Sequence, residues 1–162
     1  MALRDAYEDM TQDPLAFEFF NEIGIIDQLS GTMLDRALPK GMTRAQFTVL
    51  NHFIRLGHFE RSPAQLASAF QITRPTMTST LVRMERSGLI CIRADPKDGR
   101  AKLVSITPAG RAMRDHCIAA IAPLLPMVET LISKDELLPL VATLKHIRIA
   151  LDALRDLPTR DI

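Results

Sequence analysis

Apolar residues recur every three or four positions through most of this chain, which is the spacing of helices that bury one face. Residues that favour helix N-termini precede six of these segments. Some are Ser or Thr followed three positions later by Glu or Gln, and others are capping residues followed by proline. The six sites are Asp13-Pro14, Thr43 with Gln46, Ser62 with Gln65, Thr73, Thr107-Pro108 and Ser133 with Glu136. The pattern therefore predicts six helices.

Four of the predicted helices lie before residue 88. They are expected over residues 14–38, 43–56, 63–70 and 73–87, and Pro39-Lys40-Gly41 and Gly57 are expected to end the first two. Their inward stripes hold Phe19, Ile23, Ile26 and Met33 in the first helix and Phe47, Leu50, Phe53 and Ile54 in the second. Only Gln71-Ile72 separate the third and fourth helices, which predicts a helix-turn-helix arrangement.

After Gly88 the helical period gives way to a pattern typical of strands. Residues 89–93 form an apolar run that ends in Arg93, and residues 102–106 alternate polar and apolar. The intervening Asp95-Pro96-Lys97-Asp98-Gly99-Arg100 is rich in residues that favour a chain reversal. The sequence therefore predicts a small β-hairpin directly after the fourth helix.

The chain becomes helical again from Pro108. Pro123 and Pro126 are expected to kink or break the fifth helix, because proline removes a backbone hydrogen bond and clashes with the preceding turn. The sixth helix has apolar residues at alternating spacings of three and four, as in a coiled-coil seam, with Pro139 near its start. The seam consists of Leu137, Leu140, Leu144, Ile147, Leu151 and Leu154.

This order of elements predicts a mainly α (α+β) fold, with a winged helix-turn-helix lobe and a two-stranded wing. The lobe is expected over residues 39–110, with the helix-turn-helix at 62–87 and the wing at 89–107. The segments 1–38 and 108–162 supply the first, fifth and sixth helices, whose apolar faces are too extensive for so small a lobe to bury. These helices are therefore expected to form a dimerisation platform with a second copy of the chain.

Composition narrows the functional classes. Apolar residues make up 47% of the chain, but no apolar run approaches the roughly 20 residues that span a bilayer, and the acidic N-terminus lacks a signal core. The two cysteines have neither CxxC nor metal-ligand spacing, so we expect a cytoplasmic protein without a metal or cofactor. Because no catalytic constellation or phosphate-binding glycine loop is present, an enzyme is not expected.

Charge is unevenly distributed, although the net charge is only +1. Residues 1–38 hold two basic and eight acidic side chains, whereas residues 61–111 hold nine basic and three acidic ones. A basic segment of this kind suits a polyanion such as double-stranded DNA, although a solvated basic face has the same composition.

The fourth helix and the hairpin carry side chains that suit a DNA interface. In a helix-turn-helix the second helix enters the major groove. Here Met77, Leu81 and Met84 are expected to face the core, and Pro75, Thr76, Ser79, Arg83 and Arg86 fall on the opposite side. Hydroxyls and arginines bond bases or phosphates, and a slim hairpin can place Arg100 in the minor groove, with Asp98 orienting it through a hydrogen bond.

Plainer interpretations stay open at this point. Helix 73–87 is also compatible with an ordinary surface helix, although threonine is a modest helix former and Thr76, Thr78 and Thr80 lie close together on it. Turn 95–100 is equally compatible with a merely solvated charged loop.

From Ser62 to Arg111 the sequence resembles the MarR family (multiple antibiotic resistance regulators). The resemblance lies in Leu66-Ala67, Arg83-Met84-Glu85-Arg86-Ser87-Gly88-Leu89-Ile90, Asp98-x-Arg100 and Leu103-Val104-Ser105-Ile106-Thr107-x-x-Gly110. It implies an obligate dimer, a pseudo-palindromic operator, and repression relieved by a small molecule or an oxidant. It also implies a ligand cleft between the dimerisation helices and the DNA-binding lobe.

The resemblance further implies that residues of the fourth helix approach bases and that Arg100 enters the minor groove. The candidate DNA contacts are Thr73, Arg74, Pro75, Thr76, Thr78, Ser79 and Arg83 on the helix, Lys97, Asp98, Arg100 and Lys102 on the wing, and Ser62 at the DNA backbone.

For the cysteines and several phenylalanines, a functional role is compared with simple packing in the core. Cys91 and Cys117 are expected to be buried packing residues, and the cysteine that peroxide sensors of the family carry in the first helix is missing here. Candidates for an aromatic-effector cleft are Phe17, Phe20, Phe47 and Phe53, although phenylalanines at helical spacing are more often core residues.

The sequence thus predicts a homodimeric, sequence-specific DNA-binding transcriptional regulator, a repressor whose operator binding is relieved by a small-molecule effector. The alternative is a constitutive architectural or protein-binding winged-helix protein without an effector response. The basic segment favours DNA over protein as the partner.

Overall fold

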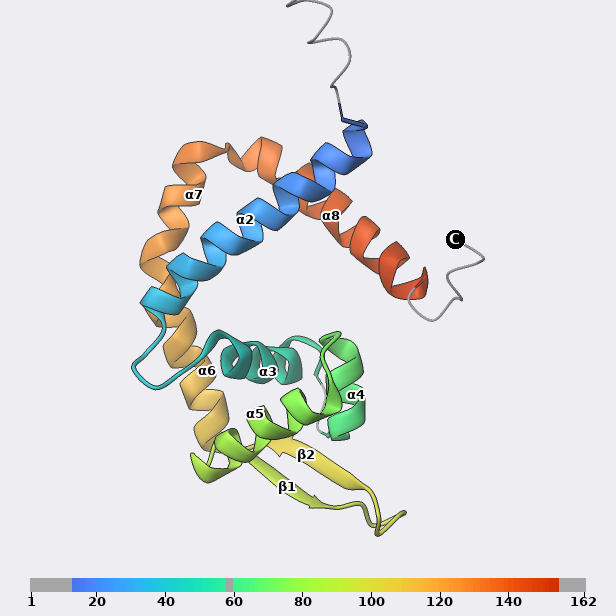
Figure 1. Cartoon of the computed structure of the whole chain (residues 1–162). Helices are drawn as coiled ribbons and strands as arrows, with labels where there is room; N and C mark the ends of the chain where they lie inside the picture. Colours follow the sequence, from blue (N-terminus) through green and yellow to red (C-terminus); the bar gives the residue numbers. More distant parts are fainter. Residues whose placement is uncertain (1–12, 58–59, 155–162) are drawn as a thin grey trace, which may run out of the picture. The chain divides into compact units, whose positions relative to one another are not determined.

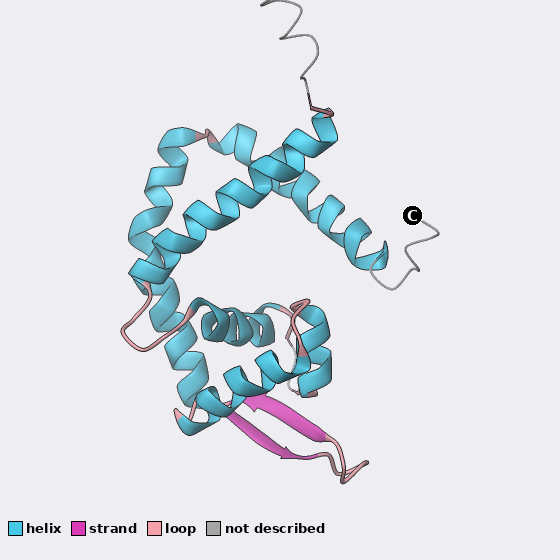
Figure 2. Cartoon of the chain, in the orientation of Figure 1, coloured by secondary structure: helices cyan, strands magenta, loops and turns pink. Residues whose placement is uncertain are grey.

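The computed structural model describes residues 13–57 and 60–154, which are mostly helical and contain one two-stranded hairpin (Figures 1 and 2). The elements are α2 (Leu15–Ala37), α3 (Arg44–Arg55), α4 (Pro63–Ala69), α5 (Arg74–Arg86), β1 (Ile90–Ala94), β2 (Lys102–Ile106), α6 (Pro108–Ile121), a 3₁₀ turn (Ala122–Leu124), α7 (Leu125–Leu131) and α8 (Lys134–Leu154). They form two compact units, divided between Ile121 and Ala122. The predicted mainly α fold with a two-stranded wing is confirmed.

Capping side chains begin most of these helices as predicted. The Thr43 hydroxyl accepts from the backbone N–H of Gln46 (3.3 Å), and the Gln46 side chain accepts in return from the N–H of Thr43 (3.0 Å). The same reciprocal bonds join Ser62 with Gln65 and Ser133 with Glu136. The expected cap at Asp13 is wrong, because Pro14 is extended (ψ 132°) rather than the first helical residue, and α2 has no side-chain cap.

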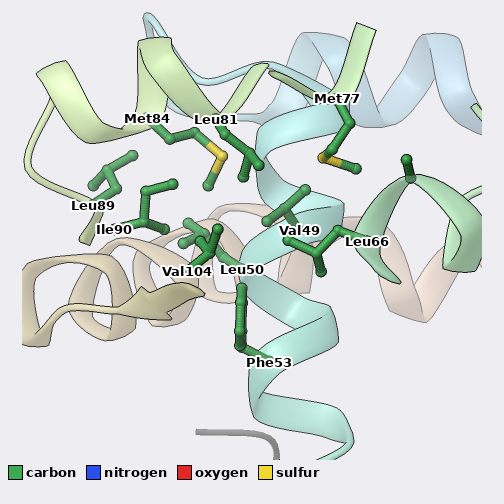
Figure 3. Close-up of a cluster of buried hydrophobic side chains, with 11 residues drawn as sticks. Val49, Leu50, Phe53, Leu66, Met77, Leu81, Met84, Leu89, Ile90 and Val104 are labelled. Carbon is green, nitrogen blue, oxygen red and sulfur yellow. The ribbon is translucent and has the colours of Figure 1, made fainter. Parts of the chain in front are cut away.

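The main core lies where α3 meets α5, α4 and the hairpin (Figure 3). Its buried residues are Val49, Leu50, Phe53, Leu66, Ala67, Met77, Leu81, Met84, Leu89, Ile90 and Val104. The predicted inner face of the fourth helix is therefore confirmed, since Met77, Leu81 and Met84 are all at most 1% exposed. The stripe on α2 is only partly confirmed, because Ile26 is 59% exposed. Burial of one face of α5 leaves its other face to solvent.

The hairpin has the alternation of a half-buried sheet. Strands β1 and β2 are antiparallel, with Ile90 opposite Ile106 and Ile92 opposite Val104. Ile90 and Val104 are buried, whereas Cys91 and Arg93, which point to the opposite face, are exposed. The hairpin thus packs on the core with one face and presents the other to solvent.

A glycine allows α6 to begin tightly against the hairpin. The Thr107 hydroxyl accepts from the N–H of Gly110 (3.0 Å) and donates to the carbonyl of Gly88 (2.7 Å). A Cβ at position 110 would lie 2.0 Å from the carbonyl oxygen of Leu89, a backbone atom that cannot move aside alone. The spacing Thr107-x-x-Gly110 therefore reflects a cap and a close backbone approach.

Proline divides the C-terminal helices as expected. α6 ends at Ile121, and the 3₁₀ turn that holds Pro123 separates it from α7, which contains Pro126. Pro139 lies inside α8, which continues through it. Among the described residues, no single helix is long and apolar enough to span a bilayer, and only the bent pair of segments 108–131 and 134–154 passes on length and composition.

Candidate nucleic-acid interface

Helices α4 and α5 form the helix-turn-helix. Gln71, between them, has a left-handed backbone (φ 52°), and both its N–H and its side-chain amide donate to the carbonyl of Ser68 (3.1 and 2.9 Å). The N–H of Ile72 donates to the carbonyl of Ala67 (3.1 Å). These bonds fix the turn between α4 and α5. Because Met77, Leu81 and Met84 bury one face of α5, the residues on its opposite face point outward.

The outward face of α5 carries the predicted set of hydroxyls and arginines. Each of the following residues is exposed: Thr73, Arg74, Pro75, Thr76, Thr78, Ser79, Arg83 and Arg86. Thr80 is an exception to the exposed threonine cluster expected from the sequence. It is only 4% exposed because it lies beside Met77 on the inner face of the helix. Its hydroxyl donates to the carbonyl of Thr76 (3.2 Å).

Two candidate contacts already serve as helix caps. The hydroxyls of Thr73 and Thr76 are 2.8 Å apart, and Thr73 also accepts from the N–H of Thr76 (3.3 Å). Ser62 accepts from the N–H of Gln65 (3.1 Å), which leaves its O–H free as a donor in this geometry. A capping hydroxyl at the start of a helix can thus also donate to a phosphate oxygen.

The hairpin tip presents charged side chains to solvent. Lys97, Asp98, Arg100 and Lys102 are all exposed. Asp98 accepts from the backbone N–H of Arg100 (3.0 Å), and Asp95 accepts likewise from that of Lys97 (2.8 Å). The expected bond between Asp98 and the side chain of Arg100 is therefore wrong: Asp98 shapes the turn, and the guanidinium has no ion pair among the described residues.

Three residues that sequence reasoning did not single out hold the hairpin in place. Arg61 pairs with Val104 through two backbone bonds (3.0 and 2.8 Å). Glu85 accepts from the N–H of Ile92 (2.9 Å), and Glu60 pairs with the guanidinium of Arg93. Only Glu85 left a signal in the sequence, as an acidic residue in the last turn of an otherwise basic helix.

A cleft of about 400 Å³ lies between the exposed side of α5 and the outer part of the hairpin. Thr78, Val82 and Glu85 line it from the helix, and Arg93, Arg100 and Lys102 line it from the hairpin. The hydroxyl of Thr78 on the helix and the basic side chains on the hairpin therefore line the same cleft.

The predicted aromatic cleft does not form within the described chain. Phe53 (1% exposed) is part of the main core, and Phe47 (8% exposed) packs with Leu38 and Cys117. Phe17 and Phe20 are exposed near the other end of α2, and at a rise of about 1.5 Å per residue Phe20 is about 27 Å along the helix from Leu38. The four rings therefore do not converge on one ligand.

Comparison with known proteins agrees with this geometry. A sequence model of the MarR family matches residues 40–101, which include the helix-turn-helix and most of the wing. MarR from E. coli in its apo form has the same fold, with a TM-score of 0.69 and 26% identity over 85% of this chain and 98% of that one. Residues 40–101 therefore resemble the MarR family in sequence, and the chain has the fold of E. coli MarR.

Two further structures extend the comparison. A cysteine-to-serine mutant of E. coli MarR complexed with operator DNA has a TM-score of 0.68 and 26% identity over 83% of this chain and 99% of that one. BpsR from Bordetella bronchiseptica has a TM-score of 0.68 and 22% identity over 81% and 98% of the two chains, so that similarity shows the fold alone.

The two cysteines of this chain differ in environment, and the expectation that both are buried is wrong for Cys91. Cys91 points to the solvent face of β1, whereas Cys117 is 0% exposed, and its burial raises the pKa of the thiol.

We expect N-ethylmaleimide at neutral pH to modify one thiol per native chain and two per denatured chain, as counted by mass spectrometry. Cys91→Ser should abolish native labelling, and two adducts on the native wild type would contradict the assigned burial.

Proposed function

We propose that this protein is a homodimeric, cytoplasmic regulator that binds a specific operator in double-stranded DNA. Each α5 enters a major groove, and each wing places Arg100 in the adjacent minor groove. The observation that carries the proposal is the exposed face of α5, where hydroxyls and arginines lie opposite the buried Met77, Leu81 and Met84. The basic tip of the hairpin, next along the chain, supplies the second contact.

Exposed apolar side chains on both units support a second copy of the chain as a partner. On α2, Leu15, Phe17, Phe20, Ile25, Ile26 and Leu29 are exposed, and on α8 no residue is buried. Four residues of the predicted α8 seam, Leu140, Leu144, Leu151 and Leu154, are each 36–49% exposed. Such faces are too apolar to remain in water, so we assign them to the dimer. To read one operator, the two α5 helices of that dimer have to lie about 34 Å apart, one turn of DNA.

Relief of repression by a small molecule is the finer part of the proposal. BpsR, which has the same fold, has its DNA binding regulated by 6-hydroxynicotinic acid. In a dimer, an effector that binds more tightly to a state with a different spacing of the α5 helices lowers DNA affinity by a shift of population. The phenylalanine set of the sequence prediction does not locate this effector, because its members lie apart.

A titration with labelled DNA tests the proposal. The probes are a fluorescein-labelled duplex from the region upstream of this protein's gene and a scrambled duplex of the same composition, at about 50 and about 200 mM salt. We expect two chains per site, preference for the upstream duplex, and affinity that falls steeply with salt.

Absence of binding to either duplex at the lower salt would overturn the DNA-binding function. Equal, weak binding to both would favour the constitutive architectural alternative. Screening of small aromatic acids for release of the bound duplex then tests the effector response.

A further inference from the structure

The wing is joined to α5 by a carboxylate as well as by the chain itself. Glu85, in the last turn of α5, accepts a hydrogen bond from the backbone N–H of Ile92 with an N···O distance of 2.9 Å. We propose that Glu85 is a positioning residue, which fixes the wing relative to α5 so that Arg100 and the helix reach the same stretch of DNA. This inference rests on the DNA-binding function proposed above.

The N–H that Glu85 accepts lies on the outer edge of the hairpin. The flanking bonds from Thr107 to Leu89 and from Asp95 to Ala101 show that the odd-numbered residues of β1 bond to β2. In an antiparallel pair the intervening residues direct their N–H groups away from the partner strand. Ile92 therefore has no partner within the sheet, and Glu85 supplies one from the recognition helix.

The opposite edge of the hairpin is also anchored by a hydrogen bond, at the residue that lies across from Ile92. Val104 is the register partner of Ile92, and its N–H donates to the carbonyl of Arg61 (2.8 Å), just before α4. Two-stranded ribbons twist more readily than larger sheets. Anchors on both edges of one cross-strand pair restrict that twist and fix the direction in which residues 95–101 project.

The chain alone does not provide this restriction. α5 ends at Arg86 and is followed by Gly88 (φ 70°), after which the N–H of Leu89 donates to the carbonyl of Met84 (3.0 Å), and this motif places only the first residues of the hairpin. The bond from Glu85 holds the hairpin at Ile92, three residues after Leu89. It is also a carboxylate in the last turn of a DNA-facing helix, where both the helix dipole and nearby phosphates disfavour a negative charge. A specific bond is a reason for its presence there.

A matched pair of variants separates the bond from the charge. Glu85→Gln and Glu85→Met both remove the negative charge and have similar lengths and helix propensities, but only glutamine keeps an oxygen that accepts from Ile92. Because both lose the same repulsion from phosphates, the difference between them reports the bond. The full-length variants are titrated with the labelled upstream duplex, and thermal unfolding is used to check that both are folded.

We expect Glu85→Met to bind the duplex about three- to tenfold more weakly than Glu85→Gln, because each of the two wings of the dimer loses part of the free energy of one hydrogen bond. We further expect this difference to disappear when Arg100→Ala is added to both variants, because the bond acts through the wing. Equal affinity of the two variants would overturn the proposal, as would a difference that persists without Arg100.

A second measurement does not depend on DNA. In nuclear magnetic resonance hydrogen exchange, the amide of Ile92 should be protected in the wild type and in Glu85→Gln, and should lose protection in Glu85→Met. If the wild type fails to bind either duplex, the proposed function and the role of Glu85 in DNA binding are both wrong. The exchange rate of the Ile92 amide then still shows whether the bond to Glu85 is formed. If the wild type binds and Glu85→Met loses neither affinity nor protection, the function stands and this inference alone fails.

Discussion

Replacing Arg100 with alanine is expected to weaken binding of the upstream duplex at least about thirtyfold and to reduce the salt dependence of binding. Arg100 is exposed at the hairpin tip with no ion pair among the described residues, so its charge is available to DNA. Loss of one arginine contact costs about 1 kcal/mol or more, and a dimer loses two. The slope of log K against log salt should become less negative by about 2, roughly 1 for each wing.

Two control variants make this result specific to the wing. Arg111→Ala removes the same charge from an exposed position on α6, and we expect it to have a much smaller effect on affinity and slope. Arg100→Lys keeps the charge but not the planar guanidinium, so it should keep most of the slope and lose part of the affinity. An Arg100→Ala protein with the wild-type salt slope would show that the wing does not contact the polyanion.

Local chemistry explains why so much of the fold was predictable. The reciprocal bonds of Thr43 with Gln46 and of Ser62 with Gln65 join residues three positions apart, so the sequence contains both partners of each. The hairpin was equally legible, because alternation and turn residues are local signals. The outward face of α5 followed from helical geometry once Met77, Leu81 and Met84 were assigned to the core.

What the sequence did not reveal depends on partners distant in the chain or on exact orientation. Glu60 and Arg93 pair across 33 positions, and spacing gives no sign of that contact. Cys91 is exposed because an alternating strand turns it away from Ile90 and Ile92, although the apolar run suggested burial on both sides. The four phenylalanines lie apart because Phe17 and Phe20 are near the start of the long helix α2, whereas Phe47 and Phe53 are on α3, and Phe47 packs with Leu38 just beyond the other end of α2.

The position of helix α5 should also depend on its buried face. Leu81→Ala is expected to lower the free energy of unfolding by about 2–5 kcal/mol, the range for truncating a buried leucine. Leu81 is 1% exposed and belongs to the cluster that α3, α4 and the hairpin form beneath α5, so neighbouring elements cannot easily close the cavity (Figure 3). Urea unfolding followed by circular dichroism, at one fixed protein concentration because a dimer is expected, measures the change.

Ser79→Ala is the matched control on the same helix, since Ser79 is exposed and is proposed to meet DNA rather than the core. We expect its unfolding free energy to stay within about 0.5 kcal/mol of the wild type while its affinity for the duplex falls. The two substitutions thus separate what holds α5 in place from what α5 presents. If Leu81→Ala unfolded at the wild-type urea concentration, the packing of α5 on the core would be wrong, and with it the assignment of its opposite face to DNA.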